Sequence, residues 1–286
     1  MINSEKKRIQ KHFNSRASCY ESSAVLQKEV CARMLERLSW IKNKPAMILD
    51  AGAGTGWGTQ GLLSYYKSSA VIAMDLSVSM LRQTKKKGGI FRKPGLLCAD
   101  AERLPLADNT FDLIFSSLML QWCHPEKVFQ EFLRILRPGG LLMFSTFGPD
   151  TLKELRHSWS VVDQAMHVNE FIDMHDLGDS LLASGFAEPV MDMDMMTLTY
   201  DDAMTVMTDL KKIGANTPVN RNMKGLLTPG KLQKVIAQYE MFRQNDCLPA
   251  SFEILYGHAW KSDKMSGRRL GGEIQIPVEN VKLIKK

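Results

Sequence analysis

The stretch ILDAGAGTGWG, residues 48–58, decides the fold of this chain. The apolar run at 46–50 predicts a buried strand, and the alternating glycines after it predict a tight turn that lets a ligand approach the bare backbone. A helix expected from about Trp57 leaves its first N–H groups free beside that turn. Asp50 precedes the turn, where it favours a ligand with an amino group and a sulfonium and repels a pyrophosphate.

A dinucleotide-binding fold is the main alternative, because it also places a glycine turn after its first strand. Its fingerprint, GxGxxG, requires a third glycine where this chain has Trp57. The glycines stand instead at 52, 54 and 56. The turn therefore favours a different ligand, which the following strands help to identify.

Strands and helices alternate after the turn. Strands are expected at 46–50, 70–74, 95–98, 111–116, 141–145, 188–200 and 251–260, and helices at 57–66, 77–87 and 125–136. This order predicts an α/β fold whose mostly parallel sheet is covered on both faces and binds ligands at the carboxyl ends of its strands. Helices are also expected over the first 40 residues, over 150–185 and over 201–245, the last as a cap inserted between two strands.

The pattern divides the chain into four parts. Residues 1–42 are expected to form a helical segment over the cofactor site, and residues 43–150 the cofactor-binding core. Residues 151–260 complete the sheet and carry the helical substrate cap, and residues 261–286 form a basic tail.

Acidic residues recur at the ends of successive strands. Asp75 ends the second strand, where its carboxylate can accept both hydroxyls of a ribose. Asp100 follows the third strand and can accept an adenine amino group, with Ala101 supplying a backbone N–H. Acids at such positions also cap helices, but three of them beside one glycine turn favour a nucleoside site.

These features resemble the class I methyltransferases that use S-adenosylmethionine. The matching segments are DAGAGTG (50–56), DLS (75–77), DAERLPL (100–106), FDLI (111–114) and RPGG (137–140). The resemblance implies a Rossmann-like sheet of seven strands, with S-adenosylmethionine as the cofactor. It implies cofactor contacts from Asp50, Gly52, Gly54, Gly56, Asp75, Leu76, Asp100, Ala101 and Ser116.

A narrower resemblance covers most of the chain, to the malonyl-acyl-carrier-protein O-methyltransferases of biotin synthesis. It rests on FNSRASCY (13–20), LQWC (120–123), STFGPDTLKELR (145–156), HVN (167–169), LKKIGA (210–215) and YGHAW (256–260). It implies methyl transfer to the free carboxyl of a malonyl thioester on an acidic carrier protein. It places Tyr20 and Gln121 near the cofactor sulfur and lets His167, Asn169, Arg156 and Lys211 hold the carboxylate or the carrier arm.

Two alternatives stay open on this scaffold. The chain also resembles a related family of mitochondrial complex I assembly factors, which implies arginine hydroxylation of a protein. The second alternative is a non-catalytic module that holds the cofactor as a structural ligand.

Composition limits the other possible functions. Residues 261–286 hold seven basic and three acidic residues, so most of the net charge of +6 lies in the tail, and no basic, aromatic face predicts nucleic-acid binding. No run approaches the roughly 20 apolar residues of a membrane span. Five scattered cysteines without a CxxC pair suit a reducing cytoplasm, and neither a metal site nor a membrane partner is expected. We expect a cytoplasmic monomer.

One further pattern predicts how a strand is buried. Met191, Met193 and Met195 alternate with Asp192 and Asp194. This period of two predicts a strand with the methionines on a buried face and the carboxylates on a solvated one.

Overall fold

The computed structural model describes residues 4–18, 20–89, 92–163, 165, 167–213, 228–262, 269–270 and 273–274. Its helices are α1 (Ser4–Arg16), α2 (Tyr20–Ser23), α3 (Val25–Ser39), α4 (Trp57–Tyr65), α5 (Val78–Thr84), η1 (Leu120–Trp122), α6 (Pro125–Ile135), α7 (Lys153–Ser160), α8 (Met174–Ser184), α9 (Ala203–Ile213) and α10 (Pro229–Glu240). Its strands are β1 (Met47–Ala51), β2 (Ala70–Asp75), β3 (Gly95–Cys98), β4 (Phe111–Ser117), β5 (Leu136–Phe147), β6 (Phe186–Tyr200), β7 (Leu248–Lys261), β8 (Arg269–Leu270) and β9 (Glu273–Ile274).

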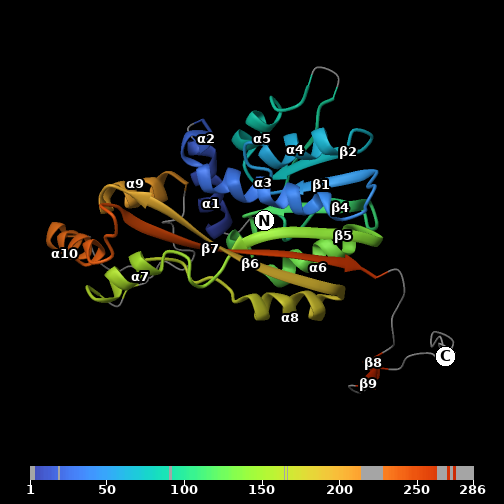
Figure 1. Ribbon diagram of the computed structural model, residues 1–286. Coiled ribbons are helices and arrows are strands. Elements are labelled where there is room, and N and C mark those ends of the chain that lie inside the picture. The colour runs from blue at the N-terminus through green and yellow to red at the C-terminus, as the bar shows by residue number, and fades with distance from the viewer. Residues whose placement is uncertain are drawn as a thin grey trace.

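The main sheet has seven strands in the order β3-β2-β1-β4-β5-β7-β6 (Figure 1). Strands β1 to β5 pair in parallel, and β7 runs antiparallel to both of its neighbours. The strand order reverses between β1 and β4, and an α/β sheet opens a crevice for a ligand at such a point. The predicted fold class and its mostly parallel sheet are confirmed.

Alternate residues of each central strand pack on opposite faces of the sheet. Ile48 and Leu113 belong to one buried apolar cluster, which includes residues of α3 and α4. Leu49 and Ile114, one position further on, belong to a second cluster with residues of α6 and α8. The sheet is therefore covered on both faces, as the alternation of strands and helices predicts.

Strand β6 forms as predicted, but the prediction of its buried face holds only in part: Met191 packs against the second cluster, whereas the burial predicted for Met193 and Met195 is wrong. Met193 and Met195 are 45% and 43% exposed, because β6 is the last strand of the sheet. The carboxylates on the other face pair with α3: Asp194 lies 3.2 Å from Nη1 of Arg33, and Asp192 pairs with Arg37. The ion pairs with α3 thus hold one face of β6, while two methionines of the other face remain exposed to solvent.

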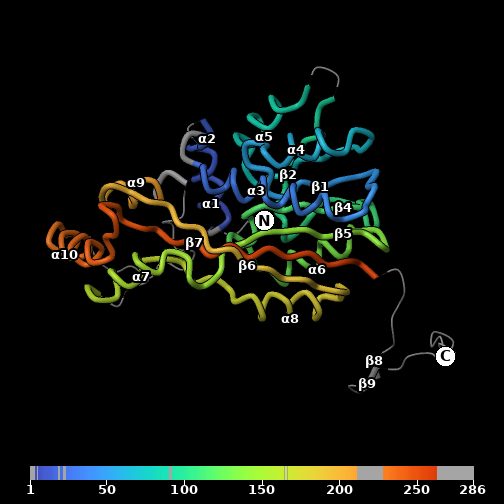
Figure 2. The backbone as a smooth tube through the Cα atoms, in the orientation of Figure 1, coloured from blue at the N-terminus to red at the C-terminus, as the bar shows by residue number. Residues whose placement is uncertain are grey.

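The N-terminal helices lie against parts of the chain that are distant in the sequence. Helix α1 contacts α5, and α2 contacts α9, which lies next to it in Figure 2. Helices α9 and α10 lie between β6 and β7 in the chain, as the cap was expected to. Among the described residues, no helix is long and apolar enough to cross a membrane.

Candidate active site

The glycine turn after β1 depends on left-handed backbone that favours glycine. Gly52 has φ +75°, and a Cβ at this position would lie 2.6 Å from both Cβ and Cγ of Met119. The N–H groups of Gly52 and Ala53 both donate to the Met74 carbonyl, at 2.8 and 2.9 Å. The turn is thereby fixed between β2 and the segment after β4, and its backbone faces the cavity between them.

Asp50, at the end of β1, is a carboxylate in apolar surroundings. It is 2% exposed and accepts a hydrogen bond from Oγ1 of Thr59 at 2.5 Å. Burial raises the pKa of Asp50 to about 7, and the nearby charge of Asp75 adds to the increase, while Thr59 opposes it. Among the described residues it makes no ion pair, so a cationic ligand would stabilise its ionised form.

Asp75, at the end of β2, holds the glycine turn from the other side. Its Oδ2 accepts from the Gly54 N–H at 2.9 Å, and its Oδ1 accepts from the Ser77 N–H at 2.7 Å. Burial raises the pKa of Asp75 to about 6, although these N–H groups oppose the increase. The carboxylate is therefore fixed in orientation, with acceptor lone pairs left for the hydroxyls of a ligand.

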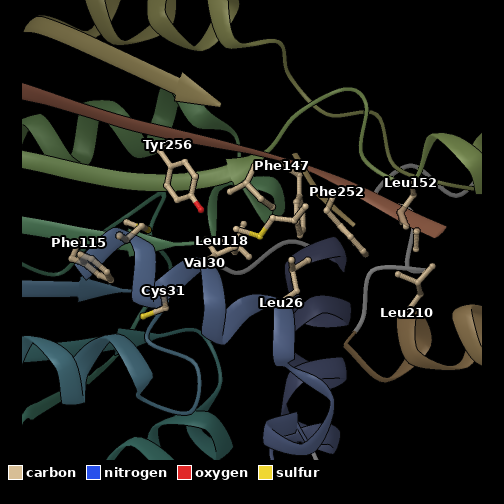
Figure 3. Close-up of a cluster of buried hydrophobic side chains, with 14 of the residues drawn as sticks. Leu26, Val30, Cys31, Phe115, Leu118, Phe147, Leu152, Leu210, Phe252 and Tyr256 are labelled. Carbon is tan, nitrogen blue, oxygen red and sulfur yellow. The ribbon is translucent and has the colours of Figure 1, made fainter. Parts of the chain in front are cut away.

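A cavity of about 140 Å³ opens between these strand ends, and we name it the first cavity. Asp100, Ala101 and Leu76 line it together with Asp50 and Asp75. The helices before β1 contribute much of the remaining wall, through Lys6, Ile9, Phe13, Tyr20, Gln27 and Cys31. Figure 3 shows Cys31 among the apolar side chains that join α3 to the sheet.

Beside the first cavity lies a second one of about 460 Å³. Among the described residues, five line both cavities, and we call them the shared wall: Lys6, Gln121, Trp122, Cys123 and Phe147. The second cavity is further lined by Thr146 and by residues 169–172, before α8. Two ligands bound side by side would therefore meet at the shared wall.

Gln121 is held at this wall by a strained turn after β4. Leu118 has φ +49°, a left-handed conformation that costs a non-glycine residue about 1 kcal/mol or more. Its carbonyl accepts from Nε2 of Gln121 at 2.6 Å, and Oε1 of Gln121 accepts from the Thr146 hydroxyl at 3.4 Å. These bonds fix the amide and leave its second N–H for a ligand.

Tyr20 and Asn169 each line one cavity. Tyr20 lines the first, where burial, assisted by the charge of Asp75, raises the pKa of its phenol. The phenol therefore remains a neutral donor at physiological pH. Asn169 is 8% exposed and lines the second cavity.

Three of the predicted residues, Gly56, Ser116 and His167, are described by the structure but do not line either cavity. Gly56 caps α4 with φ +93°, and Ser116 is fully buried with an unpartnered hydroxyl, while its neighbour Ser117 lines the first cavity. His167 stacks on Trp159 with ring centroids 3.5 Å apart and contacts Asp163 at 2.7 Å.

The two predicted cationic residues have different outcomes: Arg156 lies away from both cavities, and the side chain of Lys211 is not described. The Arg156 guanidinium donates to the carbonyls of Pro149 and Thr151, at 2.6 and 2.9 Å, and so fastens the loop before α7. Lys211 falls on α9, but its side chain lies outside the described residues. The roles predicted for these residues remain predictions.

Sequence reasoning missed Lys6, which lines both cavities. A signal for it exists, because Lys6, Ile9 and Phe13 follow helical spacing and all three line the first cavity. Because Lys6 stands among other charged residues near the N-terminus, the sequence around it nevertheless predicts that it is exposed to solvent. Only the contacts that this helix makes with distant segments reveal that Lys6 is buried.

The first cavity suits the adenosyl sulfonium expected from the resemblance. Asp50 is buried and Asp75 is partly buried, neither has an ion-pair partner among the described residues, and Asp100 adds a third carboxylate. A ligand with an ammonium group, ribose hydroxyls and an adenine amino group can donate to all three. A pyrophosphate would meet only repulsion from them.

Comparison with known proteins agrees with this site. A family profile described as "Methyltransferase domain" matches residues 49–144. A putative methyltransferase of Bacillus halodurans has a similar fold, with TM-score 0.59 and 16% identity over 81% of this chain and 98% of that one. The malonyl-[acyl-carrier protein] O-methyltransferase of Gallionella capsiferriformans is 47% identical, over 90% of this chain and 91% of its own.

A second relative of that name, from Laribacter hongkongensis, is also 47% identical, over 93% of each chain. Such identity over nearly the whole of both proteins exceeds what a shared fold alone explains. This chain belongs to the malonyl-[acyl-carrier protein] O-methyltransferase family.

Proposed function

We propose that this chain transfers a methyl group from S-adenosylmethionine to the free carboxyl of a malonyl thioester carried by an acyl carrier protein. The observation that supports the proposal is the pair of adjoining cavities. Three carboxylates line the first cavity, and the second cavity lies on the other side of the shared wall. We assign the first cavity to the cofactor and the second to the malonyl group and its thioester arm.

The residues of the first cavity would hold the cofactor by complementary charge and hydrogen bonds. Asp50 would hold the amino acid end, Asp75 the ribose hydroxyls and Asp100 the adenine amino group, and Gly52 and Gly54 would let the cofactor approach the backbone. When bound, the cofactor would supply an electrophilic methyl group: a bond from the carboxylate oxygen to the methyl carbon would form as the carbon–sulfur bond broke, and the electron pair of the broken bond would stay on the neutral thioether sulfur.

The acceptor needs alignment more than activation. A malonyl carboxylate is ionised at neutral pH, since carboxyl pKa values lie near 4, so no general base is required. Gln121 and Tyr20 are neutral donors beside the first cavity, and Asn169 is one in the second. Neutral donors can orient a carboxylate oxygen for in-line attack without suppressing its nucleophilicity as a tight ion pair would.

Esterification removes a charge whose burial in an apolar pocket costs several kcal/mol. The product therefore suits chain-elongating enzymes of fatty-acid synthesis, which agrees with an early step of biotin formation. A carrier protein is acidic, so the basic tail at 261–286 or Lys211 and Lys212 would steer its approach. We propose that the enzyme acts as a monomer, with no nucleic-acid partner.

The direct test incubates the purified chain with methyl-labelled S-adenosylmethionine and malonyl-acyl carrier protein. The expected product is a base-labile methyl ester on the malonyl group. Malonyl-coenzyme A in a parallel reaction separates the two carriers of the acyl group. If neither substrate gives an ester while the cofactor binds, the substrate assignment is wrong.

The alternatives make different predictions for one variant pair. Asp75→Ala should abolish cofactor binding, whereas Asp176→Ala, at an exposed position of α8, should not. Each is introduced into a biotin-requiring strain that lacks its own methyltransferase. Growth with Asp176→Ala but not with Asp75→Ala is expected for catalysis, whereas a wild-type chain that binds the cofactor without restoring growth would favour a scaffold role. Addition of one oxygen atom to a protein arginine, with no ester on the malonyl group, would favour the hydroxylase alternative, which the relatives' names do not support.

A further inference from the structure

Lys6 is a buried lysine at the junction of the two cavities. It is 6% exposed, and its Nζ lies 2.8 Å from Oε1 of Glu102 and 3.3 Å from Oδ1 of Asp100. The same Nζ donates to the Trp122 carbonyl at 3.3 Å. An ammonium group is buried at acceptable cost only when it is paired and hydrogen-bonded, and Lys6 meets both conditions.

The partners of Lys6 come from both sides of the shared wall. Asp100 lines the first cavity, and Glu102 lines the second. Glu102 also accepts from the His124 N–H at 2.9 Å, which connects it to the segment after η1. Burial alone would lower the pKa of Lys6, but Cys123, Glu102 and Asp100 raise it, so the group stays charged at physiological pH.

Three further contacts hold the helix that carries Lys6 over the first cavity. Gln10 donates to the Leu76 carbonyl at 2.7 Å, and Oδ1 of Asn14 accepts from the Ser77 hydroxyl at 2.7 Å. Phe13 packs edge-on against Trp122, with ring centroids 5.4 Å apart. Lys6 itself pairs with Asp100 and donates to Trp122 of the shared wall.

We infer that Lys6 is a positioning residue, which holds the Asp100 carboxylate in the orientation that receives the adenine amino group and ties α1 to the shared wall. The Nζ of Lys6 pairs with Oδ1 of Asp100, so Oδ2 remains as the acceptor for the ligand. The inference rests on the proposed function, because it assumes an adenosyl ligand in the first cavity. It predicts that Lys6 acts on cofactor affinity through Asp100.

The test is a double-mutant cycle on the affinity for S-adenosylhomocysteine, measured by titration calorimetry with the full chain. Lys6→Met should weaken binding by about tenfold or more, as should Asp100→Asn, because each removes a charge-assisted contact or its support. The double variant should bind about as weakly as the weaker single variant, since the two residues act as one unit. Lys7→Met, at the next and exposed position, is the matched control and should bind as wild type.

The cycle separates positioning from simple undocking of α1. If Lys6→Met weakened binding by the same factor in the wild-type and Asp100→Asn backgrounds, Lys6 would act on the helix alone, and the inference would fail. Unchanged affinity in Lys6→Met would also overturn it. Should Lys6→Met not fold by circular dichroism, Lys6→Gln replaces it in the same cycle. Failure of the wild-type chain to bind the probe would instead contradict the proposed function.

Discussion

Asp50→Asn should stabilise the ligand-free protein while it weakens cofactor binding. The pKa of this buried carboxyl rises from 3.8 to about 7. Because one pKa unit corresponds to about 1.4 kcal/mol, ionisation of Asp50 costs the folded chain roughly 4 kcal/mol. Asparagine keeps one oxygen for the Thr59 hydroxyl and carries no charge. Allowing about 1 kcal/mol for a weakened hydrogen bond, we expect a net gain of roughly 2–4 kcal/mol.

The gain should depend on pH in a defined direction. A carboxyl whose pKa is raised in the folded state binds its proton more tightly there than in the unfolded chain. The stability that the folded chain gains from binding this proton is therefore fully present below pH 4, and it is lost as the pH rises through about 7. Since asparagine does not titrate, the variant should be about 1 kcal/mol less stable than wild type at low pH, because of the weakened hydrogen bond, and its gain in stability should be largest at pH 8.

Urea denaturation of ligand-free protein at pH 5, 6, 7 and 8 measures this difference directly. Asp112→Asn is a control of opposite sign, because burial of Asp112 is outweighed by hydrogen bonds from Met47 and Arg137, which lower its pKa. That variant should lose stability at pH 8. Affinity of Asp50→Asn for S-adenosylhomocysteine should fall at least about tenfold. A variant that is no more stable than wild type at pH 8 would refute the reasoning.

Three further variants, with one control, test the two cavities. Gly52→Ala should cost about 1–3 kcal/mol in urea denaturation, because its Cβ would meet Met119 at 2.6 Å. Gly54→Ala, also at positive φ but without a close neighbour, should cost less, and equal losses would contradict the steric argument. Gln121→Ala should lower kcat about tenfold or more with little change in cofactor affinity, since it removes an amide N–H at the shared wall; an unchanged kcat would exclude that role. Asn169→Ala should raise KM for the malonyl substrate without altering cofactor affinity, which separate titrations of the two ligands would establish.

The parts of the site that could be predicted are those that a pattern of neighbouring residues in the sequence indicates. Asp50 and Asp75 end apolar strands and flank a glycine turn, so the sequence around each indicates both the element and the ligand edge of the sheet. Ser116 shows the limit of such reasoning. It and Ser117 are adjacent in β4, and only the packing of the strand decides which of the two reaches the first cavity.

The sequence by itself determined the sheet, the glycine turn and the acidic strand ends, because periodicity, turn chemistry and backbone freedom operate over a few neighbouring residues. Only the tertiary structure decided that Lys6 is buried, since its partner Trp122 is 116 positions away. It also decided that Met193 is exposed, because the sequence does not reveal that β6 forms the sheet edge. Burial of a side chain depends on which distant element packs against it, and no local pattern of residues encodes that choice.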